Sequence, residues 1–150
     1  MKSFLLALGL CAAICAAFLS CGEKDDKENA AALCAGKFAR NFFNFRYVDA
    51  LACCTDGSRR VLEFCASNMS ARMVDSLRNI TDTPTVSVVE TVVLNDSEAE
   101  CVVDVENGIY ADTIGGLPVP RQGRRSYRFS LVKEGGEWKV RMADLPRSGK

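Results

Sequence analysis

Histidine is entirely absent from this chain of 150 residues. Without imidazole, serine–histidine and cysteine–histidine catalytic pairs, histidine metal ligands and histidine pH switches are all excluded. Net charge is lacking too, because 19 Lys plus Arg balance 19 Asp plus Glu. The chain therefore has no overall basic character of the kind that binds nucleic acid, and we expect no such partner. The content of 48% hydrophobic and 25% charged residues is typical of one globular domain.

No Cys-x-x-Cys pair occurs, although the chain contains eight cysteines. Five of them lie beyond residue 30, namely Cys34, Cys53, Cys54, Cys65 and Cys101. Without histidine a zinc site would need four converging thiolates, so we expect no metal and no other cofactor. Because five is an odd number, at least one thiol stays unpaired in a monomer. A disulfide between two of Cys34, Cys53, Cys54 and Cys65 would link the helices and stabilise the fold by roughly 2–4 kcal/mol. The sequence leaves open which two would pair.

The chain begins with an apolar segment of the kind that directs export. Lys2 precedes the apolar run 4–19, which is followed by Ser20-Cys21-Gly22 and a charged stretch. This order of a basic residue, an apolar run and a cleavage zone is typical of a signal peptide. The run is shorter than the ~20 apolar residues that a membrane span requires. A retained anchor and an ordinary secretory signal are the alternatives.

The residues Leu19-Ser20-Cys21-Gly22 resemble the lipobox of bacterial lipoproteins. The resemblance implies a signal peptide at 1–20, a lipid attached to Cys21, and a charged tether at 21–29. Acyl chains on one residue would hold the protein firmly at a membrane. Lys24-Asp25-Asp26 resembles the signal that sends Bacteroidota lipoproteins to the surface, although charged residues are equally expected in a tether. We therefore expect an outer-membrane lipoprotein of the cell envelope, on its periplasmic or surface-exposed face.

Apolar residues spaced three and four apart predict two long amphipathic helices, with a short helix at 50–54 between them. The first stripe comprises Ala31, Cys34, Phe38, Phe42 and Phe45, and the second comprises Val61, Cys65, Met69, Met73 and Leu77. Stripes at this spacing usually form core, because an amphipathic helix is stable only when one face is buried. We interpret both stripes in this way rather than as cofactor sites.

The second half of the chain predicts two antiparallel hairpins. A β-branched run at 85–94 is followed by a turn and an alternating strand at 99–105. A second pair, 127–132 and 138–142, flanks Glu134-Gly135-Gly136-Glu137. We expect these residues to face the helices: Cys101, Val103, Val105, Tyr127, Phe129, Leu131, Trp138, Val140 and Met142. Residues 81–120 contain no Lys or Arg, whereas nine basic residues follow from Arg121 onward. This split predicts ion pairs across strands on the solvent face.

Helices followed by antiparallel strands predict one α+β domain at 30–146, with a short tail at 147–150. The N-terminal helices would pack on a curved antiparallel sheet of about four strands. The motifs that carry a family resemblance are Phe42-Phe43-x-Phe45-x-Tyr47-Val48-Asp49-Ala50-Leu51 and Tyr127-x-Phe129-x-Leu131-Val132-Lys133-Glu134-Gly135-Gly136-Glu137-Trp138. In an exported lipoprotein they resemble small Bacteroidota lipoproteins of unknown function, which are similar to the nuclear transport factor two-like (cystatin-like) superfamily.

The resemblance implies a cone whose interior is a ligand pocket, an enzyme site or a plain core. Isomerase and hydratase members use Asp, Tyr or His there. Because this chain has no His, an enzyme would have to rely on Tyr47, Tyr110, Tyr127 or a displaced carboxylate, and we assign no catalytic residue. We expect a non-catalytic, lipid-anchored protein that binds a small apolar ligand or an envelope protein. The pocket residues expected are Phe42, Tyr127, Phe129 and Trp138. The alternatives are an isomerase-like or hydratase-like enzyme, and a structural or assembly lipoprotein acting through the long loop 107–124.

Overall fold

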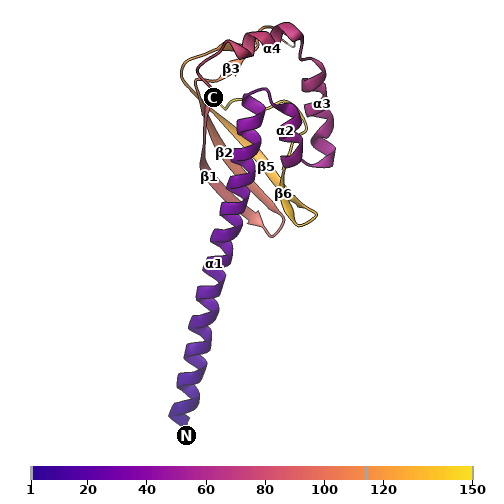
Figure 1. Ribbon diagram of the computed structural model, residues 1–150. Helices are drawn as coiled ribbons and strands as arrows, with labels where there is room; N and C mark the ends of the chain where they lie inside the picture. Colours follow the sequence, from indigo (N-terminus) through magenta and orange to yellow (C-terminus); the bar gives the residue numbers. More distant parts are fainter. Residues whose placement is uncertain (1, 114, 150) are drawn as a thin grey trace.

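One long helix crosses a four-stranded sheet, and shorter helices close one end (Figure 1). The computed structural model describes the backbone of residues 2–113 and 115–149, and the side chains of residues 22–113 and 115–149. The helical elements are α1 (Lys2–Phe43), α2 (Tyr47–Ala50), η1 (Leu51–Cys53), η2 (Asp56–Ser58), α3 (Arg59–Ser67) and α4 (Ala71–Arg78). The strands are β1 (Thr85–Asn95), β2 (Glu98–Glu106), β3 (Ile109–Tyr110), β4 (Val119–Pro120), β5 (Arg124–Glu134) and β6 (Glu137–Arg141).

The main sheet has the order β1-β2-β5-β6, and all its neighbouring strands are antiparallel. Both expected hairpins are present, with their turns between Asn95 and Glu98 and between Glu134 and Glu137. A register shift between Val88 and Glu90 interrupts the β1–β2 ladder, and such bulges bend a strand and increase its twist. β3 and β4 form a separate two-stranded sheet inside the loop that leads from β2 to β5.

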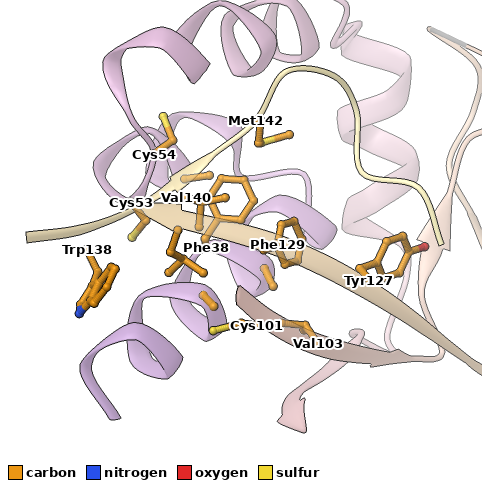
Figure 2. Close-up of a cluster of buried hydrophobic side chains, with 14 of the residues drawn as sticks. Phe38, Cys53, Cys54, Cys101, Val103, Tyr127, Phe129, Trp138, Val140 and Met142 are labelled. Carbon is orange, nitrogen blue, oxygen red and sulfur yellow. The ribbon is translucent and has the colours of Figure 1, made fainter. Parts of the chain in front are cut away.

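The core lies between α1 and the inner face of the sheet. Phe38 is fully buried and meets Phe129 edge to face, with 5.4 Å between the ring centroids. All nine sheet residues that the alternation predicts to face the helices are buried. Figure 2 shows this cluster, with α1 behind the strands that carry Cys101, Phe129 and Val140. The predicted α+β architecture of helices on a curved sheet of four strands is therefore confirmed.

The outer face of the sheet carries ion pairs between the acidic and the basic hairpins, as the charge split predicts. Arg128 bonds Glu100 at 2.9 Å across β2 and β5, and Arg124 bonds Glu106 at 2.6 Å. These side chains are largely exposed, so each pair contributes little free energy by itself. Because each pair joins an acidic strand to a basic one, together they favour the observed strand pairing over like-with-like pairing.

The short helix expected at 50–54 is instead α2 followed by the 3-10 helix η1, and the two predicted long helices also need correction. The stripe that continues to Phe45 predicts a longer first helix, but α1 ends at Phe43. The second predicted long helix is two helices, because Ser70 accepts a hydrogen bond from the Met73 N–H at 3.2 Å and caps a new helix, α4. The preceding turn is closed by the Asn68 side chain, which donates to the Phe64 carbonyl at 2.7 Å. Side-chain bonds to the backbone therefore override the continuous apolar spacing.

The expected charged tether is helical over its described residues and belongs to α1. Lys27 bonds Glu23 at 2.8 Å one turn away, and it also reaches Asp96 in the β1–β2 turn at 3.0 Å. The N-terminal charged segment is thus attached to one tip of the sheet. The five cysteines beyond residue 30 are free thiols in this structure.

Candidate functional site: an aromatic cavity at the end of α1

A cavity of about 350 Å³ opens where the C-terminal end of α1 meets α3, α4 and the loop containing β3. Ligand pockets commonly have volumes of ~300–1,000 Å³, so the space suits a small molecule. The lining is mainly aromatic and apolar and comprises Phe42, Phe43, Phe45, Tyr47, Phe64, Cys65, Asn68, Met69, Met73, Ile109, Tyr110, Ala111, Asp112, Thr113, Gly115, Tyr127, Leu145 and Pro146.

The turn that ends α1 positions the aromatic wall. The Arg46 N–H donates to the Asn41 carbonyl at 2.8 Å, and the Phe45 N–H donates to the Phe42 carbonyl at 3.1 Å. This pair of bonds is a Schellman motif, whose left-handed position is usually occupied by glycine. Here Phe45 occupies it with φ of 60°, which is costly for a residue with a side chain. The cost is offset in part by the Phe45 ring, which lies 5.8 Å from the Tyr47 ring in the cavity wall.

Two tyrosine hydroxyls form the principal polar feature of the cavity. The Tyr127 hydroxyl donates to the Tyr110 hydroxyl at 3.2 Å. The pKa of Tyr127 is raised, first by burial and then by this hydrogen bond, and burial also raises the pKa of Tyr47. Both phenols are therefore neutral at ordinary pH. Because Tyr127 uses its own proton on Tyr110, the Tyr110 hydroxyl retains a proton that it can donate to a ligand.

Local backbone geometry explains how Tyr110 reaches this position. Asn107 has φ of 52°, and its N–H donates to the Gly123 carbonyl at 3.0 Å. Tyr110 folds back over Gly108, where any Cβ would collide with the tyrosine ring. The Arg125 guanidinium lies 4.5 Å from the centroid of the same ring, which is a cation–π distance. The Asn107-Gly108 pair is thus a sequence signal for the placement of Tyr110.

Asp112 is the carboxylate in the lining, and it lies at the rim. Its side chain is 78% exposed and is paired with Arg121, the residue that follows β4. Cys65 also borders the cavity, and burial raises the pKa of its thiol. Among the described residues, no group of three or more acidic or cysteine side chains is arranged to hold a metal ion. The cavity can therefore enclose an apolar body and offer hydrogen bonds to it from a few polar side chains in its lining.

The structure separates the four residues predicted to form a pocket. Phe42 and Tyr127 line the cavity, whereas Phe129 and Trp138 do not. Figure 2 shows Tyr127 and Trp138 at opposite ends of the buried cluster, with Phe129 between them. Phe129 is 3% exposed because it packs against Phe38, and Trp138 packs beneath Lys133, whose ammonium lies 5.3 Å from its ring. Residues that share a sheet face need not share a cavity.

Other cavity residues come from segments that were not predicted to form a pocket. Met69 and Met73 belong to a stripe interpreted as core, yet both border the cavity. Six lining residues come from the loop 107–124, namely the five from Ile109 to Thr113 and Gly115. The three tyrosines considered for an enzyme, Tyr47, Tyr110 and Tyr127, all meet here. Only the packing of distant segments brings these groups together.

The residues of the predicted anchor lie at the opposite end of the molecule. The side chain of Cys21 is outside the described residues. Lys24, Asp25 and Asp26 are exposed on α1, and Lys24 lies 3.9 Å from Glu28. Within the described residues, no helix combines the length and the apolar character needed to traverse a bilayer.

Comparison with known proteins identifies the fold. Neither a protein-family model nor a curated protein sequence matches the chain. A solved structure of a ketosteroid isomerase-like protein from Erwinia carotovora atroseptica matches with a TM-score of 0.55 at 15% sequence identity. The match covers 77% of this chain and 92% of that chain. Helices followed by a curved four-stranded antiparallel sheet, together with this match, show that the chain has the nuclear transport factor two-like α+β fold.

Proposed function

We propose that the chain is a lipid-anchored envelope protein that binds a small apolar ligand in the aromatic cavity, without chemical conversion of that ligand. The observation that carries the proposal is a cavity of about 350 Å³ walled by aromatic rings and containing the Tyr110–Tyr127 hydroxyl pair. An apolar lining with a few convergent polar groups is the usual composition of a ligand pocket.

The lining favours a planar ligand with one hydrogen-bond acceptor. Flat molecules stack well on aromatic rings, and rings of Phe42, Phe45 and Tyr47 are available in the wall. The Tyr110 hydroxyl supplies one proton for an acceptor on the ligand. A strongly anionic or highly polar ligand would leave its charge against apolar surface, which is unfavourable.

The position of the cavity on α1 suits an anchored receptor. The charged segment begins at Glu23, two residues after Cys21, and the cavity wall begins at Phe42 on the same helix. At 1.5 Å per residue, this length of helix spans about 30 Å. Figure 1 shows the N-terminal end of α1 projecting away from α4 and β3. A lipid on Cys21 would thus hold the cavity well away from the bilayer surface.

Ligand binding can be tested with naphthol as a defined aromatic alcohol, by calorimetric titration of the full chain. We expect saturable binding at one site and weaker binding of naphthalene, which lacks the hydroxyl. Loss of one hydrogen bond in Tyr110→Phe should weaken naphthol binding by about two- to tenfold. Ala111→Phe should fill the cavity and abolish binding. Val119→Phe is the matched control, because Val119 pairs with Tyr110 but does not line the cavity. Equal binding by both phenylalanine variants would refute the site.

The anchor needs a separate test in a bacterium that processes lipoproteins. We expect labelled palmitate on the native chain and none on Cys21→Ser, with the variant moving to the soluble fraction. Cys34→Ser is the matched control, and it should be labelled normally. Unlabelled native protein, or membrane-bound Cys21→Ser, would contradict lipid anchoring without affecting the cavity.

A second candidate is an isomerase-like or hydratase-like enzyme. It is favoured by three tyrosines and Asp112 in one cavity and by the likeness to a ketosteroid isomerase-like protein. A general base must reach the proton that it removes, but Asp112 is mostly exposed and paired with Arg121. Conversion of an unsaturated ketosteroid by the native chain, lost in Asp112→Asn, would replace the binding proposal with this one.

A third candidate, a structural or assembly protein acting through loop 107–124, shares residues with the cavity. A substitution at Val119 distinguishes this candidate from ligand binding, because the Val119 side chain is 50% exposed and does not line the cavity. Val119→Glu should release a bound envelope protein without changing naphthol binding if the loop is a partner surface.

A further inference from the structure

Tyr47 carries a cavity hydroxyl that comes from a different part of the fold than the Tyr110–Tyr127 pair. Tyr47 begins α2, just after the turn at Phe45, whereas Tyr110 belongs to β3 and Tyr127 to β5. All three tyrosines line the cavity. A helical element and two strands therefore bring hydroxyl groups to the same space from separate walls.

Two phenylalanine rings lie between these walls. The Tyr47 ring meets the Phe42 ring edge to face with 5.5 Å between the centroids, and Phe42 meets Phe43 in the same way at 5.3 Å. The Phe43 ring then lies 4.5 Å from the Tyr127 ring. The consecutive residues Phe42 and Phe43 thus form a continuous aromatic wall, and a tyrosine lies at each of its ends.

The Tyr47 hydroxyl is available to a ligand. Among the described residues it has no hydrogen-bond partner, whereas the Tyr127 hydroxyl donates to Tyr110 at 3.2 Å. Every fully buried polar side-chain atom of the described residues does have a partner. The Tyr47 side chain is only partly buried, so its hydroxyl must contact open space. Burial raises the pKa of Tyr47, so the hydroxyl keeps a proton that it can donate.

We propose that Tyr47 is a second hydrogen-bonding residue of the ligand site, so that the cavity selects a flat, elongated molecule with a hydroxyl or carbonyl group at each end. This inference rests on the proposed function, in which Tyr110 binds the first polar group. The second group bonds the Tyr47 hydroxyl, and the body of the ligand lies against the rings of Phe42 and Phe43. A molecule with one polar end leaves a tyrosine hydroxyl unpaired and binds more weakly.

The size of the cavity suits such a molecule. A cavity of ~150 Å³ holds benzene, so the volume of about 350 Å³ accommodates two fused rings. Hydroxyls on adjacent carbons of a fused pair point to the same end and reach one tyrosine end of the wall. Hydroxyls at opposite ends match the arrangement here, because two phenylalanine rings separate Tyr47 from Tyr127.

Two isomers of dihydroxynaphthalene test the selectivity by calorimetric titration of the full chain. The end-to-end isomer, 2,6-dihydroxynaphthalene, carries its hydroxyls on opposite ends, and the adjacent isomer, 2,3-dihydroxynaphthalene, carries them side by side. The two have the same composition, so the comparison isolates the placement of the second hydroxyl. We expect the native chain to bind the end-to-end isomer about two- to tenfold more tightly, which is the effect of one neutral hydrogen bond. Equal affinities would overturn the proposal.

A variant identifies the residue responsible. Tyr47→Phe keeps the ring, removes the hydroxyl and should abolish the preference between the two isomers. Val48→Ala is the matched control, because Val48 is the next residue, is 71% exposed and does not line the cavity. It should retain the preference of the native chain. A preference that persists in Tyr47→Phe would contradict the role of Tyr47.

Naphthol separates this inference from the proposed function. If naphthol binds the native chain and the two isomers bind equally, the cavity remains a ligand site and the role of Tyr47 is refuted. If naphthol and both isomers fail to bind, the ligand site and the role of Tyr47 are refuted together.

Discussion

Phe38 and Phe42 lie one helical turn apart on α1, and their environments differ completely. Phe38 is fully buried against Phe129, whereas Phe42 is partly exposed and borders the cavity. Their own rings stack with 5.7 Å between centroids. Identical residues at helical spacing therefore form the core in one position and the cavity wall in the next. The difference arises because the sheet covers the first turn, while the cavity opens at the second.

The largest expected effect concerns this pair. Phe38→Ala should destabilise the domain by about 3–5 kcal/mol, because it opens a hole in a close-packed core. Phe42→Ala should cost less than half of that amount, since its ring already faces open space on one side. Urea unfolding of both variants measures the difference. Equal losses would show that the cavity end is packed as tightly as the core.

A pH series extends the comparison to Cys53, whose carbonyl oxygen lies 3.7 Å from the Cys34 thiol of α1. The pKa of Cys53 falls from 9.0 to about 6 in the folded state, so folding favours the thiolate. This contribution is fully present above pH 9 and is lost as the pH falls through about 6. Stability should therefore decline from pH 9 to pH 6. Cys53→Ser should flatten the slope, whereas Cys54→Ser should keep it. A flat profile for the native chain would show that Cys53 has an ordinary pKa.

The N-terminal cap of α4 stabilises the helix that carries the cavity residue Met73. Ser70→Ala removes the bond to the Met73 N–H and should cost about 1 kcal/mol in the free energy of unfolding. Ser76→Ala, inside the same helix, should be nearly neutral because alanine is a better helix former than serine. Ser70→Ala should also weaken naphthol binding, since Met73 is in the cavity wall. Identical results for both serines would mean that α4 does not depend on its cap.

The smallest effect is expected on the outer face of the sheet. Arg128→Ala removes the exposed pair with Glu100 and should cost about 0.5 kcal/mol or less, with the loss disappearing at high salt. Thermal unfolding at two salt concentrations measures it. A large, salt-independent loss would mean that the arginine stem packs on the sheet and that its charge matters little.

Sequence patterns were sufficient where each element is governed by its own residues. Alternation in the segments 99–105, 127–132 and 138–142 identified nine inward residues, all of them buried, because a strand with one buried face must alternate. Sequence patterns were insufficient where one element ends and the next begins. Phe45 continues an apolar spacing but takes a left-handed conformation at a helix end, and Ser70 interrupts a stripe by capping. The conformation of Phe45 and the cap formed by Ser70 depend on particular hydrogen bonds to the backbone, which the spacing of apolar residues does not reveal.

By itself the amino-acid sequence determined the α+β class, the two hairpins, the buried sheet face and the charge pairing across it, because all of these follow from local periodicity and from opposite charges on successive hairpins. Only the tertiary structure decided that Phe42 and Tyr127 face a cavity while Phe129 and Trp138 do not. It also decided that the Cys34 thiol lies 3.7 Å from the Cys53 carbonyl oxygen. Such contacts join segments far apart in the chain, and their geometry is set by how α1 lies across the sheet.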